Sequence, residues 1–215
     1  MEVQSSLFAA DAAPEVGSRP AAPLAPLAGS LLRTSLAHGA WVDVRPGWVR
    51  AADPVFAALV ERVDWRAERR TMYDRVVEVP RLTRFYAVDE PWPHPALERM
   101  RAALSDHYRA ELREPFRTAG CCYYRDGEDS VAWHGDTVGR ASTEDTMVAI
   151  VSFGDVRRLS LRPRGGGSSR SFAMGHGDLL VMGGSCQRTW EHAVLKSTVP
   201  VGPRISVQFR PAGVR

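Results

Sequence analysis

The second half of the chain is a succession of short apolar segments, each closed by glycine, proline or another turn residue. This pattern constrains the fold more than any other feature. We predict strands at residues 121–124, 131–136, 146–153, 157–162, 171–174, 179–182, 189–195 and 205–209. Asp126-Gly127, between the first two, is a hairpin-type turn signal. Regularly spaced short strands are typical of closed antiparallel folds, so we expect a double-stranded β-helix, or jelly roll.

The first half instead shows helical periodicity. Asp53-Pro54 predicts a helix through about residue 64, with Asp53 as N-cap, and a second amphipathic helix is expected over 95–112. Residues 40–49 read as a strand, and the arginine- and aromatic-rich stretch 65–79 as a hairpin or loop. The expected fold class is therefore α+β, a jelly roll with N-terminal helices packed on one sheet.

We expect one domain in three parts. Residues 1–28, rich in alanine and proline, are expected to form a flexible or wrapping arm. Residues 29–118 are the N-terminal helical part, and 119–215 are the jelly-roll core. No apolar run reaches the ~20 residues that span a bilayer, and no signal peptide is evident. Three cysteines do not form a disulfide framework, so we expect a cytoplasmic protein. We also expect it to be monomeric and not to associate with a membrane.

Two histidines and one aspartate suggest a metal centre. His134 and Asp136 lie two residues apart, so in an extended strand both leave the same face. Far downstream, His192 offers a second imidazole. Two imidazoles and one carboxylate, with the remaining positions open, form the facial triad of non-haem Fe(II) oxygenases. The spacing alone is weakly specific, because His-x-Asp recurs by chance.

The last predicted strand alternates strictly between apolar and polar side chains. Ile205, Val207 and Phe209 would face a core, which leaves two arginines and two polar residues on the other face. One interpretation is a half-exposed strand with a solvated polar face. The other places the polar face inside the barrel, where arginines bind a dicarboxylate through paired hydrogen bonds.

Three separated motifs now carry a resemblance. The segments YYRDGEDSVAWHGD, GHGDLLVMGGSCQRTWEH and RISVQFR together resemble the AlkB family of Fe(II)/2-oxoglutarate-dependent dioxygenases. The resemblance covers residues 78–210 well and 40–77 loosely. It implies that Fe(II), 2-oxoglutarate and O2 are used to demethylate N-alkylated bases in DNA, with RNA as a second candidate substrate, and that formaldehyde, succinate and CO2 are released.

The resemblance also assigns roles to individual residues. It implies that the metal and catalytic residues are His134, Asp136 and His192. It implies that 2-oxoglutarate is bound by Arg204 and Tyr124 at the distal carboxylate and by Arg210 at the metal end.

Two positions depart from the family pattern. The family often has asparagine where this chain has Cys122 and Ser206, which we include in the predicted co-substrate site. Each lost amide removes a hydrogen bond of about 1 kcal/mol. Residues 137–140 also lack the acidic residue that in the family often contacts the substrate base.

A damaged base must leave the stack to reach a buried iron and then needs aromatic and basic contacts. We expect a nucleotide-recognition lid at about 65–92, in which each aromatic residue is individually more typical of core packing. The candidate substrate-binding residues are Tyr73, Trp65, Arg70, Tyr86 and Trp133, with Phe85 and Trp92 as further aromatic candidates.

Two alternatives stay open at this point. One is a 2-oxoglutarate oxygenase of the same fold that acts on a small molecule or a protein. The other is a barrel that binds nucleic acid without catalysis, with a metal that is only structural.

Overall fold

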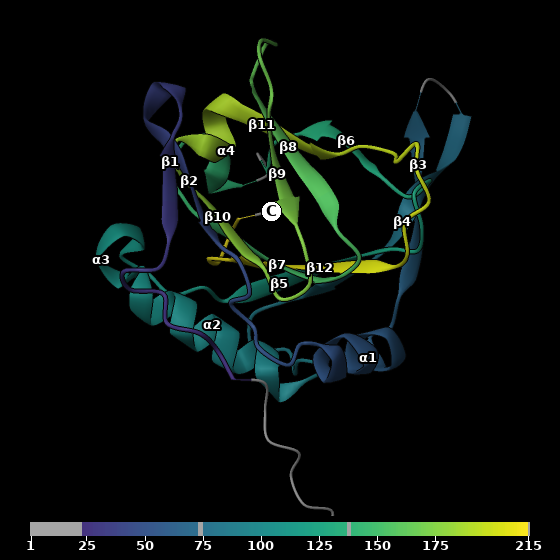
Figure 1. Cartoon of the computed structure of the whole chain (residues 1–215). Helices are drawn as coiled ribbons and strands as arrows, with labels where there is room; N and C mark the ends of the chain where they lie inside the picture. The colour runs from purple at the N-terminus through teal and green to yellow at the C-terminus, as the bar shows by residue number, and fades with distance from the viewer. Residues whose placement is uncertain (1–22, 73–74, 137–138, 215) are drawn as a thin grey trace, which may run out of the picture.

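A computed structural model describes residues 23–72, 75–136 and 139–214. In it, two antiparallel sheets face each other (Figure 1). The larger has eight strands, in the order β1 (Leu32–Ser35), β2 (Ala40–Arg45), β10 (Leu179–Gly184), β7 (Val148–Gly154), β12 (Arg204–Arg210), β5 (Thr118–Tyr124), β4 (Arg75–Tyr86) and β3 (Arg66–Met72). The smaller has four, in the order β6 (Val131–His134), β11 (Trp190–Val194), β8 (Arg157–Pro163) and β9 (Arg170–Met174). This is the expected jelly roll.

The expected hairpin at Asp126-Gly127 is wrong. The strands on either side of it, β5 and β6, belong to different sheets, so the segment between them crosses the barrel end. Its polar groups bind one another: the Arg125 guanidinium and backbone N–H donate to Asp129, and Asp126 accepts from the Glu128 N–H. Arg157 also donates to the carbonyls of Asp126 and Asp129. These hydrogen bonds satisfy the polar groups of a wide turn, which in a hairpin would have been satisfied by pairing between the two strands.

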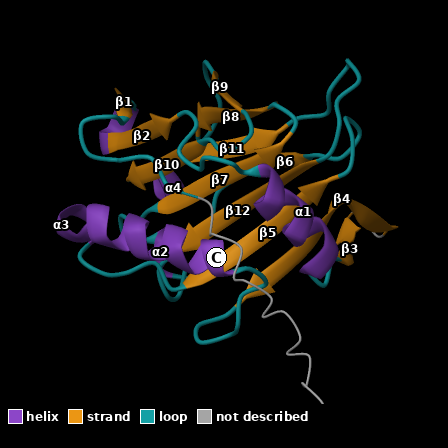
Figure 2. Ribbon diagram, turned by 60° about the horizontal axis from the view of Figure 1, so that its bottom comes forward, coloured by secondary structure: helices purple, strands orange, loops and turns teal. Residues whose placement is uncertain are grey.

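Helices cover the outer face of the large sheet (Figure 2). They are α1 (Asp53–Arg62), α2 (Pro95–His107) and α3 (Arg109–Leu112). The N-cap of α1 is Ala52, one residue earlier than expected, and the long second helix breaks at Tyr108. The Tyr108 hydroxyl donates to buried Asp43. Apolar residues of α2, such as Leu97 and Met100, pack with the outward side chains of β12 in one core.

A second apolar core lies between the two sheets. Strand β12 lies between this inner core and the outer core beneath the helices. Ile205, Val207 and Phe209 belong to the outer core beneath the helices. Arg204, Ser206, Gln208 and Arg210 alternate with them and therefore point into the barrel. The first three are 1%, 3% and 9% exposed, so the polar face of this strand is inside the barrel, as the second interpretation of its alternation predicted.

Residues 29–118 supply more sheet than expected, because β1 to β4 all come from this part. Of the predicted arm, residues 1–22 lie outside the described residues. Leu24 forms a bridge with Val49, and Ala25 and Leu27 are buried in the outer core, so this short stretch wraps the fold. The remaining elements are short: η1 (Ala37–Gly39), η2 (Arg140–Ser142) and α4 (Cys186–Thr189).

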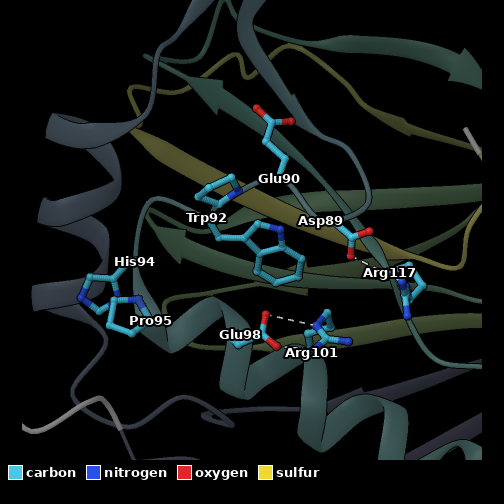
Figure 3. Close-up of a pocket in the computed structure, with 9 residues that line it drawn as sticks. Asp89, Glu90, Trp92, His94, Pro95, Glu98, Arg101 and Arg117 are labelled. Carbon is cyan, nitrogen blue, oxygen red and sulfur yellow. Dashed lines mark hydrogen bonds and ion pairs between the residues drawn. The ribbon is translucent and has the colours of Figure 1, made fainter.

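A hollow of about 370 Å³ opens on the helical side of the large sheet, around Trp92 (Figure 3). Its floor is the Trp92 ring, which packs at 5.6 Å from the Phe209 ring of the outer core. Its charged groups bind one another, Glu98 with Arg101 and Asp89 with Arg117. Because Phe209 points away from the barrel, this hollow is separate from the inner polar face. Among the described residues, no helix is long and apolar enough to cross a membrane.

Candidate metal centre

The two histidines and the aspartate meet at one end of the small sheet. His134 on β6 and His192 on β11 are direct cross-strand partners, and their ring centroids lie 4.2 Å apart. Asp136 follows β6 by two residues, and one of its oxygens lies 4.0 Å from Nε2 of His134. A ligand atom of each residue lies within 4.8 Å of the other two. These separations fit one divalent ion between two imidazole nitrogens and a carboxylate.

Hydrogen bonding selects which nitrogen of His134 can bind a metal. Nδ1 lies 2.8 Å from the Ala132 carbonyl, which can only accept, so Nδ1 carries the proton. Nε2 is then the lone-pair nitrogen on the side of Asp136. This backbone contact supplies the outer hydrogen bond that orients a metal-binding imidazole. The His134 side chain is 39% exposed, whereas the Asp136 side chain is only 7% exposed, so the site opens to solvent on the side of His134.

Electrostatics hold the ligands in their metal-binding protonation states. Burial lowers the pKa of His192 to about 3, with His134 adding to the effect, so the imidazole is neutral. Burial alone would raise the pKa of Asp136, but Arg210 and the two imidazoles outweigh it and the pKa falls to about 2. Nε of Arg210 donates to Oδ2 of Asp136 at 2.8 Å, and Nη2 forms an ion pair with the same oxygen at 2.7 Å. The carboxylate is thus ionised and has its second oxygen free for a metal.

A buried arginine lies at the other end of the same strand face. Nε of Arg204 donates to Oγ of Ser152 at 2.8 Å, and the guanidinium lies 5.3 Å from the Tyr124 ring centroid. Nη1 of Arg204 is buried without a hydrogen-bond partner among the described residues. A buried guanidinium with an open donor requires an anion or another acceptor. The distal carboxylate of 2-oxoglutarate meets that requirement, with the keto acid toward the metal ligands, so the residues present fit both Fe(II) and the co-substrate.

The other predicted co-substrate residues lie on the same inner face. Tyr124 and Cys122 are the cross-strand partners of Arg204 and Ser206 on β5. Ser206 accepts from the Gln208 amide, and the Cys122 thiol lies 3.9 Å from the other end of that amide. These predicted residues are thus adjacent, and their binding role stays a prediction.

The predicted substrate residues that the structure describes lie elsewhere. Trp65 packs against Tyr123 on the outer face of the large sheet, and Tyr86 is buried in the outer core. Trp133 precedes His134 in β6, so its side chain points to the opposite, outer face of the small sheet. There Cζ of Arg162 lies 4.4 Å from the centroid of the Trp133 ring. All three point away from the metal ligands, and their contact with a base stays a prediction. Tyr73 lies outside the described residues, and so does the side chain of Arg70.

Sequence reasoning also missed residues on the inner face. Arg81 on β4 donates to the Ser130 carbonyl, just before β6, and so links the two sheets near the metal ligands. Gln208 and Gly120 face each other on β12 and β5. The alternation of polar and apolar residues in β12 places Gln208 on the same face as Arg204 and Arg210. That pattern could have predicted Gln208 as an inner-face residue.

Comparisons with known proteins agree with this geometry. The fold resembles that of a 2OG-Fe(II) oxygenase family oxidoreductase from Burkholderia pseudomallei (TM-score 0.56, 14% identity, covering 79% of this chain and 84% of that one). It also resembles OsALKBH1 (TM-score 0.54, 13% identity, 84% and 100%). Residues 49–210 match the model of the 2OG-Fe(II) oxygenase superfamily. The chain therefore belongs to the 2OG-Fe(II) oxygenase superfamily, whose members use Fe(II) and 2-oxoglutarate.

Curated relatives of this chain include proteins named as AlkB homologues. Alpha-ketoglutarate-dependent dioxygenase alkB homolog 3 is 31% identical over 190 residues in Bos taurus, covering 77% of this chain and 64% of that protein. The Homo sapiens protein of the same name is 29% identical over 194 residues, which cover 79% of this chain and 65% of that protein. The human DNA oxidative demethylase ALKBH2 is 31% identical over 129 residues, which cover 56% of this chain and 47% of that protein. This chain thus spans slightly less than two thirds of the length of the first two.

Proposed function

We propose that this chain is a 2-oxoglutarate-dependent dioxygenase that removes methyl groups from the ring nitrogens of nucleobases in DNA or RNA. The observation that carries the proposal is the placement of the triad and of Arg204 between the same two sheets, with the buried Nη1 of Arg204 lacking a hydrogen-bond partner among the described residues. A metal-only structural site would not require a buried cation beside it. The names of the relatives, one of them a DNA oxidative demethylase, support the substrate class.

Each polar residue has a defined part in this proposal. His134, Asp136 and His192 would hold the iron, which supplies the oxidation of a C–H bond when it is bound. Arg204, with the Tyr124 ring beside it, binds the distal carboxylate of 2-oxoglutarate. Arg210 keeps Asp136 ionised and oriented. Arg204, Ser206 and His192 are buried, so water is largely excluded from the co-substrate end of the site.

The proposed reaction balances as follows. One oxygen atom of O2 is inserted into a methyl C–H bond, and the other enters succinate as 2-oxoglutarate loses CO2. The N-hydroxymethyl group then leaves as formaldehyde, and the hydroxyl proton is transferred so that the unmodified base is restored. No side-chain nucleophile is needed, and no cysteine is assigned a catalytic role.

The experiment is to incubate the full chain with Fe(II), 2-oxoglutarate and single-stranded DNA that carries 1-methyladenine or 3-methylcytosine. We expect formaldehyde to be released in proportion to succinate, and His134→Ala to abolish both products. His107→Ala is the matched control, because His107 is an exposed residue of α2 outside the centre. Succinate without formaldehyde from any methylated oligonucleotide would favour an oxygenase with a small-molecule or protein substrate. No succinate at all would favour a non-catalytic barrel.

A further inference from the structure

The carboxylate of the metal centre is held differently from the two imidazoles. His134 and His192 are cross-strand partners within the small sheet, so backbone pairing fixes their separation. Asp136 lies two residues beyond the end of β6, outside that pairing. The contact with Arg210 fixes one carboxylate oxygen but not the main chain that carries it. The position of Asp136 therefore depends on what binds the segment after β6.

The main chain just after the metal carboxylate is bound by the residues that directly follow β12. Gly139 forms an antiparallel bridge with Val214. Arg140 donates from its backbone N–H to the carbonyl of Gly213 at 3.4 Å and from Nε to the carbonyl of Ala212 at 3.1 Å. Three consecutive residues after β12 thus bind two consecutive residues after β6, starting only three positions beyond the metal ligand.

This contact between the two segments is close and anchored in the core. Gly139 has a φ of +78°, and a methyl group placed on it would lie 2.2 Å from the carbonyl oxygen of Gly213. Glycine is therefore required for the two main chains to approach. Val214 is 1% exposed and belongs to the inner core, as does Ala141. A buried apolar side chain in each segment thus secures the contact.

The Arg140 guanidinium joins these two segments to a third part of the chain. Besides the Ala212 carbonyl, it binds the carboxylate of Glu114, which precedes β5. A carboxylate oxygen of Glu144 lies 3.5 Å from Nη1. Two carboxylates thus orient the guanidinium so that Nε is directed at a main-chain carbonyl. Lysine could not reproduce this arrangement, because only arginine has N–H donors in fixed, different directions.

We propose that Arg140 and residues 211–214 position Asp136 for the metal, with Arg140 acting through the main chain rather than on the ion. The inference rests on the iron site of the proposed function but not on the identity of its substrate. Without these contacts, Asp136 is held by Arg210 alone and the metal affinity falls. Because such coupling is reciprocal, a bound ion must strengthen the binding of residues 211–214 by the same factor.

Titration of the full chain with Mn²⁺ in the absence of oxygen tests the metal side of this coupling. Arg140→Met removes the contacts of the guanidinium, and Arg140→Lys keeps the charge but not the fixed geometry. Gly139→Ala places a methyl group against the Gly213 carbonyl. Arg188→Met is the matched control, because Arg188 forms an ion pair with Asp145, which also lies shortly after β6 in the sequence.

We expect the Mn²⁺ affinity to fall about tenfold in Arg140→Met, Arg140→Lys and Gly139→Ala, at the lower end of the effect of residues that orient metal ligands. Arg188→Met should bind Mn²⁺ as the wild-type chain does. Urea denaturation of the metal-free proteins identifies the variants that are folded during the titration. Wild-type affinity in the folded variants of Arg140 and Gly139 would overturn the inference.

Hydrogen–deuterium exchange of the wild-type chain tests the other side of the coupling without any substitution. Saturating Mn²⁺ should slow exchange of the Arg140 N–H, which donates to Gly213, by about tenfold, as reciprocity requires. Amides of α2, which lies outside the metal centre, should exchange as before. Exchange at Arg140 that is independent of Mn²⁺ would overturn the inference, because a merely structural contact would behave in this way.

Failure of the proposed function gives a different result. If Mn²⁺ binds and the variants lose affinity, but no methylated oligonucleotide yields formaldehyde, the positioning role stands and the proposed substrate class fails. If the wild-type chain binds no Mn²⁺, both fail.

Discussion

Arg210 contacts a single oxygen of Asp136 twice, through a hydrogen bond from Nε at 2.8 Å and an ion-pair contact of Nη2 at 2.7 Å. The pair joins the last strand of the large sheet to the segment that follows β6 of the small one. It leaves Oδ1 of Asp136 for the metal and opposes the rise in pKa that burial would otherwise impose on this carboxyl. The metal centre is therefore assembled across both sheets.

Arg210→Met should weaken metal binding at this centre. Without the guanidinium, the buried Asp136 loses its counter-charge and its fixed orientation, and its pKa rises. Outer partners of this kind typically contribute about 10–100-fold in metal affinity. Titration with Mn²⁺ in the absence of oxygen measures the change. Arg162→Met is the matched control, because Arg162 binds Glu191 on the outside of the small sheet. Equal Mn²⁺ affinity in all three proteins would contradict the role given to Arg210.

Arg204→Met should raise the KM for 2-oxoglutarate and leave the affinity for Mn²⁺ alone nearly unchanged. A hydrogen bond to a charged group contributes about 1.5–3 kcal/mol, which corresponds to a change of about 10–100-fold. Tyr124→Phe should have a smaller effect, because the ring that lies beside the guanidinium is retained. The rate of succinate formation at varied 2-oxoglutarate concentration gives the KM of each variant. A KM for Arg204→Met within twofold of wild type would exclude Arg204 from the co-substrate site.

The metal-free protein should lose stability as the pH falls below about 6.5. The pKa of His192 is lowered from 6.5 to about 3 in the fold, so only the unfolded chain takes up this proton in between. The free energy of unfolding then falls by about 1.4 kcal/mol per pH unit for this group. Urea denaturation between pH 6 and pH 4 measures the slope. His192→Gln should lower the slope of the free energy of unfolding against pH by about 1.4 kcal/mol per pH unit, which corresponds to one proton. An identical slope in the wild-type and variant proteins would show that His192 is protonated in the fold.

Tyr108→Phe should destabilise the fold without affecting the metal centre. The Tyr108 hydroxyl donates to buried Asp43 at 3.0 Å, and Arg33 donates two further bonds to the same carboxylate at 2.7 Å. Loss of the single hydroxyl should cost about 1–2 kcal/mol. Asp43→Ala should cost more, about 3–5 kcal/mol, since it leaves the buried hydroxyl unpaired and Arg33 without its main partner. Urea denaturation provides the comparison, and equal costs would show that Asp43 gains nothing from Arg33.

The metal centre was accessible to sequence reasoning because local spacing fixes it. His134 and Asp136 are two positions apart in the sequence, and in an extended strand that spacing places both side chains on one face. The alternation from Arg204 to Arg210 likewise predicted which side chains share the inner face. The remote partner His192 could not be placed by spacing and entered through the resemblance of whole motifs.

The sheet face on which the candidate substrate residues lie could not be predicted from the sequence, for a physical reason. Both faces of the large sheet are buried, one under helices and one under the small sheet, so hydrophobicity does not distinguish them. The face of Tyr86 or Trp65 depends on register with neighbouring strands, and a shift of one residue reverses it. The turn at Asp126-Gly127 failed similarly, because local turn chemistry does not reveal that the next strand joins another sheet.

The central claim is that His134, Asp136 and His192 form one metal centre with Arg204 binding the co-substrate beside it. Equilibrium binding of Mn²⁺ and of 2-oxoglutarate under nitrogen tests it most directly. We expect one Mn²⁺ per chain, tight 2-oxoglutarate binding only when Mn²⁺ is present, and loss of both in Asp136→Ala and His192→Ala. Full Mn²⁺ stoichiometry in these variants, or 2-oxoglutarate binding that is independent of metal, would contradict it.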